Sequence, residues 1–122
     1  MTAKLAAIIL GIVFVAVGLL GFVNNPVLGL FAVDPIHNLI HIVSGVVLLA
    51  GAYSSLGSTL ALRIIGIVYA LVAILGFFLV DTNGMLLGIF MVNEADKWLH
   101  VVLAVVILAA GFALPQDEMQ TA

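Results

Sequence analysis

The side chains of this chain that could do chemistry are three histidines and one aspartate, arranged as two pairs. His37 and His41 are four residues apart, as are Asp96 and His100. Positions four apart lie on the same face of a helix, so each pair is predicted to share one face. Neutral imidazoles with a carboxylate suit zinc, iron or copper, and a histidine beside an aspartate can relay protons. A metal or proton site at these four residues is therefore one hypothesis for the function.

Two stretches of the sequence occur twice, and the copies of the second stretch both begin with a histidine. The paired stretches are GIVFVAVGLLGF at residues 11–22 with GIVYALVAILGF at 66–77, and HIVSGVVLLA at 41–50 with HVVLAVVILA at 100–109. A fixed internal repeat of this kind predicts a duplicated structural unit. The alignment places His41 opposite His100 and His37 opposite Asp96, so we expect any site to draw on both halves.

The composition predicts an integral membrane protein. Hydrophobic residues make up 66% of the 122 residues and charged residues 7%, with a mean hydropathy of +1.43. A soluble domain of this size could not bury so much apolar surface. Four apolar segments are each ~30 Å long as a helix, which matches the bilayer core, and long runs in lipid must be helical. These segments are residues 4–23, 35–53, 60–80 and 94–114.

The predicted fold is all-α: an integral membrane four-helix bundle built from two tandem two-helix repeats. It forms one transmembrane domain over residues 1–122, with the first repeat at about 4–53 and the second at about 60–114. A short polar tail follows at 115–122. Small residues are predicted to let the helices pack closely. They are Gly11, Gly18, Gly45, Gly66, Ala70 and Ala104.

Capping residues predict that the second and fourth helices begin in register. Asp34 and Asn93 align in the two copies and both are favourable N-caps, and Pro35 suits the first helical position. His41 and His100 then lie seven residues beyond their caps, about 10 Å below the membrane surface. If these two helices face each other across a pseudo-twofold axis, three imidazoles and a carboxylate converge.

The loops that precede these helices, residues 24–33 and 81–92, are unusually apolar and share a Gly-apolar-Phe step. We expect interfacial or re-entrant segments that fold back over the helix starts and pack on the histidine region, because exposed irregular backbone is not tolerated at membrane depth.

The charges indicate an orientation and exclude two classes of function. Lys4 and Arg63 lie on the side of the termini and Lys97 on the other, which predicts cytoplasmic termini. A net charge of −3 with three Lys or Arg residues argues against nucleic-acid binding. The absence of cysteine excludes disulfides, thiolate metal sites and thiol nucleophiles.

Two motifs at the helix starts carry a resemblance to a known family. The first reads HNLxH and comprises His37, Asn38, Leu39 and His41; the second reads NxADxWLH and comprises Asn93, Ala95, Asp96, Trp98, Leu99 and His100. With the surrounding sequence they resemble the bacterial membrane proteins grouped as domain of unknown function 4383. The resemblance implies a multi-pass protein of the bacterial inner membrane, and it implies no activity.

Our first functional hypothesis is a non-catalytic accessory or structural subunit without a cofactor. A polar cluster near the outer face would hydrogen-bond the two repeats together, since polar groups hold membrane helices together. Its members are His37, Asn38, His41, Asp96, Trp98 and His100. The expected partners are the lipid bilayer and other membrane subunits or further copies of the chain. Catalysis is not expected, because Ser44 beside His41 has no third group to orient the pair.

The alternative to a structural cluster is a pigment or electron-transfer subunit. His41 and His100, at equal depth on separate helices, could be the axial ligands of haem b or chlorophyll. Gly45 and Ala104 lie one turn further along each helix. Such small residues also favour helices packed directly together, at about 8 to 10 Å, where a macrocycle needs a wider gap.

Overall fold

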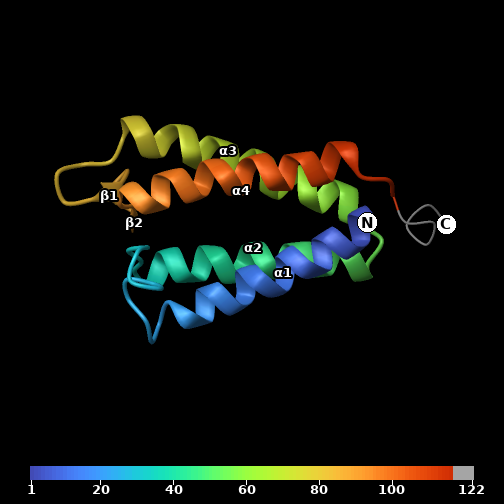
Figure 1. Ribbon diagram of the computed structural model, residues 1–122, viewed down its shortest axis with the longest axis horizontal. Helices are drawn as coiled ribbons and strands as arrows, with labels where there is room; N and C mark the ends of the chain where they lie inside the picture. The colour runs from blue at the N-terminus through green and yellow to red at the C-terminus, as the bar shows by residue number, and fades with distance from the viewer. Residues whose placement is uncertain (117–122) are drawn as a thin grey trace.

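The computed structural model describes residues 1–116, and it consists of four long helices and one short hairpin (Figure 1). Its elements are α1 (Ala3–Leu20), α2 (Pro35–Tyr53), α3 (Ser58–Phe78), β1 (Met85–Leu86), β2 (Phe90–Met91) and α4 (Glu94–Ala113). All four helices are long and apolar enough to cross a membrane. The predicted four-helix membrane fold is confirmed, with helix ends shifted by up to three residues. Most of the predicted polar tail, residues 117–122, lies outside the described residues.

The four helices form two antiparallel pairs, as the duplication predicts. The pairs α1 with α2 and α3 with α4 make the most extensive helix contacts, and the α2 and α3 helices join them. Figure 1 shows both ends of the chain and the α2–α3 connection at one end of the molecule. The two long loops lie at the other end, which we call the loop end. This arrangement places the starts of α2 and α4 side by side at the same end.

Glycines let the helices of each pair approach closely. A Cβ atom added to Gly45 of α2 would lie 2.6 Å from the carbonyl oxygen of Gly11 on α1, and one added to Gly66 of α3 would lie 2.7 Å from the Leu108 side chain on α4. Gly18 likewise lies against α2, near Ile42. The prediction that these glycines are packing positions is confirmed. The space beside Gly45 is occupied by α1 and is not open to a cofactor.

Replacing Gly45 by alanine should destabilise the protein by about 1–3 kcal/mol, because the new methyl group meets rigid backbone of α1. Thermal unfolding in mild detergent measures this loss. The matched control is Gly76→Ala on α3, whose added methyl group would have its nearest neighbours at 3.8 and 3.9 Å. That change should be neutral or stabilise the helix by up to about 1 kcal/mol. Equal losses in both variants would contradict the packing argument.

The two apolar loops fold back over the starts of α2 and α4 as predicted, but each contains a tight turn that the sequence pattern did not predict. Residues 27 and 31 form a β-bridge, and residues 86 and 90 pair in the corresponding way within β1 and β2. In each loop a leucine and then a glycine have positive φ: 55° and 73° at Leu28 and Gly29, and 53° and 68° at Leu87 and Gly88. Two such residues in succession make the tight turn typical of hairpins. The buried loop residues are Val27, Val33, Leu86, Phe90 and Val92.

Candidate metal centre

The N-caps of α2 and α4 fix the starts of these helices and link the two repeats. Asp34 Oδ1 accepts a hydrogen bond from the His37 amide at 2.8 Å, and Asn93 Oδ1 accepts one from the Asp96 amide at 2.9 Å, so both predicted caps are confirmed. Each cap also reaches across to the opposite loop. Asp34 Oδ2 accepts from the Met91 amide at 3.0 Å, and Asn93 Nδ2 donates to the Leu30 carbonyl at 2.9 Å. The two helix starts are therefore held at a common depth.

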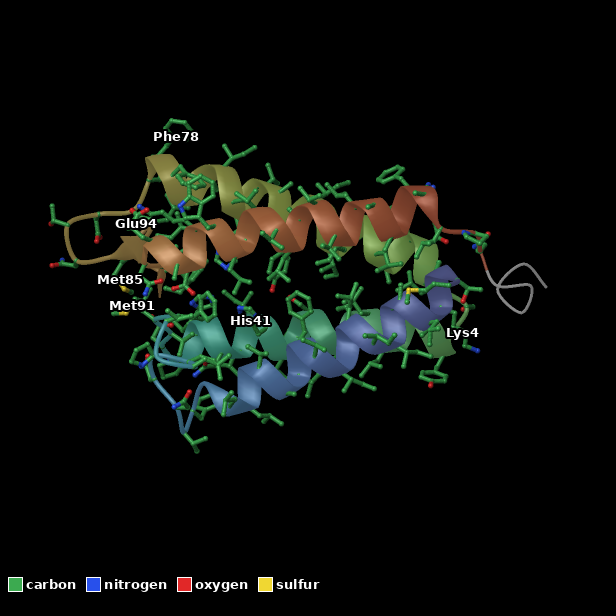
Figure 2. The ribbon with its side chains drawn as sticks, in the orientation of Figure 1. Lys4, His41, Phe78, Met85, Met91 and Glu94 are labelled. Atoms are coloured by element: carbon green, nitrogen blue, oxygen red, sulfur yellow. The ribbon has the colours of Figure 1, made fainter. Side chains whose placement is uncertain are left out.

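Three histidines meet between α2 and α4, and we call them the triple-histidine centre: His37, His41 and His100. One possible ligand atom from each lies within 4.8 Å of those of the other two. The ring centroids are 5.0 Å apart for His37 and His41, 5.6 Å for His37 and His100, and 6.5 Å for His41 and His100. All three side chains are buried, and Figure 2 shows His41 pointing from α2 into the space between the helix pairs. The predicted convergence of three imidazoles is present.

The loop that precedes α4 orients the first of these rings. His37 Nδ1 lies 2.8 Å from the carbonyl oxygen of Met91. A carbonyl can only accept, so Nδ1 carries the proton, and Nε2 of the neutral ring has a free lone pair. That Nε2 atom is buried and has no hydrogen-bond partner. Histidines that bind metals commonly have this arrangement, in which the second ring nitrogen donates to a carbonyl and fixes the tautomer.

A second buried nitrogen, Nδ1 of His100, also lacks a hydrogen-bond partner. Leaving a buried polar group unpaired costs about 1–3 kcal/mol. Within residues 1–116, no hydrogen bond joins two of the three histidines or joins one of them to Asp96. The closed hydrogen-bonded network expected of a purely structural cluster is therefore not formed, and the centre has nitrogen lone pairs to offer a ligand.

Asp96 and Trp98 do not join the centre, which corrects the predicted cluster. Asp96 is buried, but its Oδ2 accepts from the Asn93 amide at 3.0 Å and so closes a capping box at the start of α4. It lies outside the group of possible ligand atoms. The Trp98 side chain is 61% exposed and packs edge-on against Phe77 at 5.2 Å, on the outer surface. Asn38 is buried, but its side chain lies against Gly21 at the end of α1.

Two aromatic rings that were not predicted to belong to the site pack against the centre. Phe14 of α1 stacks on His41 at 5.5 Å, and Tyr69 of α3 meets His100 edge-on at 5.9 Å. The two rings also contact each other, with centroids 5.2 Å apart. They occupy the same position in the two copies, GIVF and GIVY, so the repeat alignment carried a signal for them. The centre is thus enclosed by one aromatic ring from each repeat.

The hydroxyl of Tyr69 has a defined hydrogen bond beside the centre. Ser44 Oγ donates its single proton to the Ile40 carbonyl at 2.7 Å, so Tyr69, whose hydroxyl is 3.0 Å away, must be the donor to Ser44. Tyr69→Phe should cost about 1 kcal/mol through loss of this bond. Tyr69→Ala should cost about 3–5 kcal/mol through loss of the ring. Thermal unfolding of both variants tests this order, and equal losses would show that the hydroxyl, not the ring, is what matters.

The packing around the rings leaves no space for a haem or chlorophyll between His41 and His100. His37 lies beside both rings, and Phe14 and Tyr69 lie against them. The adjacent groove, between α1, α4 and the first loop, has a volume of about 150 Å³, well below the roughly 300–1,000 Å³ of ordinary ligand sites. The residues present therefore do not fit the axial-ligand hypothesis.

Comparison with known proteins places the chain in a family. No match was found among curated proteins or among solved structures. The family described as "Domain of unknown function (DUF4383)" matches residues 4–113, a range that includes all four helices and the triple-histidine centre. The chain therefore belongs to this family, which confirms the resemblance carried by its two helix-start motifs.

Proposed function

We propose that the protein is a non-catalytic accessory protein of the membrane that holds one transition-metal ion at the triple-histidine centre. The observation that carries this proposal is the gathering of His37, His41 and His100, whose possible ligand atoms lie within 4.8 Å of one another inside an apolar bundle. Imidazole suits zinc, copper, iron and nickel. A small inward movement of the three rings would bring the nitrogens to one ion.

The unpaired nitrogens support binding over a purely structural role. Nε2 of His37 and Nδ1 of His100 are buried without partners. A metal ion bound by the two rings would compensate the cost of burying these unpaired nitrogens. The Met91 carbonyl already orients the His37 ring, and such outer partners typically contribute about 10–100-fold in metal affinity.

The enclosure of the centre supports binding without catalysis. Catalytic metal sites keep an open position that a substrate can reach. Here His37 and His100 are each 1% exposed, and the groove beside His41 is small and lined by apolar side chains such as Leu99 and Leu103. Substrate access is therefore restricted, while a single ion could enter as the loops move.

The rival function is structural, and the ring contacts favour it. His41 packs against Phe14 as one more ring of the core, and His37 packs against Phe90 at 5.2 Å. In that case the histidines would contribute packing alone, and leucine at the same positions would serve poorly because it cannot stack. The two functions differ in whether the purified protein binds an ion.

Metal binding by the whole protein in mild detergent tests the proposal. After chelator treatment, the protein is dialysed separately against Zn(II), Co(II), Ni(II) and Cu(I), and bound metal is counted by mass spectrometry. We expect one ion per chain for at least one metal. The His100→Leu variant should lose more than roughly 100-fold in affinity, because even partners outside the ligand shell contribute about 10–100-fold.

The control variant is Trp98→Leu, which changes a ring on the outer surface, away from the triple-histidine centre. It should bind the ion as the wild type does. The proposal is wrong if no metal binds above the chelator-treated background. It is equally wrong if His100→Leu leaves the affinity unchanged.

A further inference from the structure

Two methionines lie directly opposite each other at the loop end, and we call them the methionine pair: Met85 and Met91. They are partners in the antiparallel register of β1 and β2. Opposed residues of such a pair point to the same face, with Cβ atoms about 4.5–5.5 Å apart. Both are partly exposed, and Figure 2 shows both sulfur atoms at the loop end, near the start of α4. Two thioethers are thus available together at the surface.

The methionine pair is joined to the triple-histidine centre through the main chain of Met91. The carbonyl of Met91 accepts the hydrogen bond from His37 Nδ1 at 2.8 Å, and its amide donates to Asp34 Oδ2 at 3.0 Å. Both partners lie in the first turn of α2 or at its cap. The thioethers at the surface and the buried imidazoles are therefore neighbours at the loop end.

The charge of the centre restricts the ion that it can hold. The three ligands are neutral imidazoles, and among the described residues no carboxylate belongs to the group. Taking an ion out of water into an apolar interior is expensive, and the cost rises with the square of the ionic charge. A site without a compensating anion therefore favours a monovalent ion over a divalent one.

We propose that the ion is Cu(I), captured by the methionine pair and passed to the triple-histidine centre. This inference rests on the proposed function and names the metal of the same site. Thioethers select Cu(I) among the biological transition metals, and imidazoles also bind copper. Lys97 at the same end is paired with Glu94, which leaves the carboxylates of Asp34 and Asp81, beside the main chain of Met91 and Met85, to attract cations toward the pair. The ion moves by exchange of neutral ligands and keeps its oxidation state.

An anaerobic competition experiment tests the identity of the ion. The wild-type protein in mild detergent is titrated with Cu(I) against a coloured Cu(I) chelator, and separately with Zn(II) and Co(II) against chelators of those ions. We expect one Cu(I) per chain, bound at least roughly 100-fold more tightly than either divalent ion, because of the ligand set and its lack of charge.

The role of the methionine pair is tested by the rate of loading. In the double variant Met85→Leu and Met91→Leu, which nearly conserves side-chain volume, loading should slow by about tenfold or more, as expected when a capture site for a cation is removed. The affinity at equilibrium should stay within about threefold, because the imidazoles are untouched. Met1→Leu, at the other end of the molecule, is the matched control and should load at the wild-type rate.

The outcomes separate this inference from the proposed function. Tight, histidine-dependent binding of Zn(II) or Co(II) without a preference for Cu(I) would overturn the inference and leave the proposed function standing. Binding of no metal would overturn both. Preferred Cu(I) binding with an unchanged loading rate in the methionine variant would overturn the capture role of Met85 and Met91.

Discussion

Replacing His41 and His100 together by leucine should leave the metal-free protein at least as stable as the wild type while removing all stabilisation by metal. Leucine fills a similar volume and brings no unpaired nitrogen into the core. Exchanging buried polar groups for apolar groups of similar shape is often neutral or stabilising. The free energy of unfolding of the metal-free variant should therefore equal or exceed that of the wild type.

The same experiment in the presence of metal should give the opposite order. An ion that binds only the folded state stabilises it by about 2.7 kcal/mol when its free concentration is 100 times the dissociation constant. The wild type gains this amount and the double variant gains nothing. Thermal unfolding in mild detergent, with and without the bound ion, measures both differences.

Trp98→Leu is the matched control, because this lipid-facing ring lies outside the centre. It should keep the full stabilisation by metal. If the double histidine variant were clearly less stable than the wild type without any metal, the rings would act as packing, and the structural function would be the better account.

Replacing Asp34 by alanine should lower both the stability of the fold and its affinity for metal, because one carboxylate serves both repeats. It caps α2 through the His37 amide and holds the second loop through the Met91 amide. Loss of an N-cap costs about 1 kcal/mol, and a hydrogen bond to a charged group about 1.5–3 kcal/mol. Together the unfolding free energy should fall by about 2–4 kcal/mol. Metal affinity should also fall by about 10–100-fold, because Met91 orients His37.

Thr2→Ala provides the comparison for loss of a cap alone. Thr2 Oγ1 accepts from the Leu5 amide at the start of α1. Its loss should cost about 1 kcal/mol or less, with no change in metal affinity. The losses of stability and metal affinity in Asp34→Asn should lie between those of Thr2→Ala and Asp34→Ala, since the amide offers one acceptor oxygen where the carboxylate offers two. Equal effects of Thr2→Ala and Asp34→Ala would show that the link to Met91 contributes nothing.

Local sequence patterns were sufficient for the architecture of the bundle. Apolar segments of membrane length, the paired caps Asp34 and Asn93, and the duplicated histidines predict four helices with α2 and α4 in register, and the structure has them. The small residues at Gly11 and Gly45 also act where the pattern suggests. These features depend on residues near each other in the sequence or on comparison of the two copies.

Local sequence patterns could not predict which residues belong to the triple-histidine centre. Spacing places Asp96 on the face of His100, yet its carboxylate is used by the backbone at the start of its own helix. Spacing likewise does not predict which way the Trp98 side chain points, and its ring faces outward. The contact of Met91 with His37 joins residues 54 positions apart, and periodicity carries no information about such a pairing. Competition for hydrogen bonds and long-range contacts decided these positions.

The difference between the copies at His37 and Asp96 has a consequence for the symmetry of the centre. Two identical two-helix chains associating about a twofold axis would supply every side chain in duplicate, so their ligands at such a site could number only two or four. Because both copies lie in one chain, the position of His37 could become an imidazole while its counterpart Asp96 became a helix cap. Compared with two identical chains, only the single chain with two diverged copies can have an odd number of ligands at this pseudo-symmetric centre.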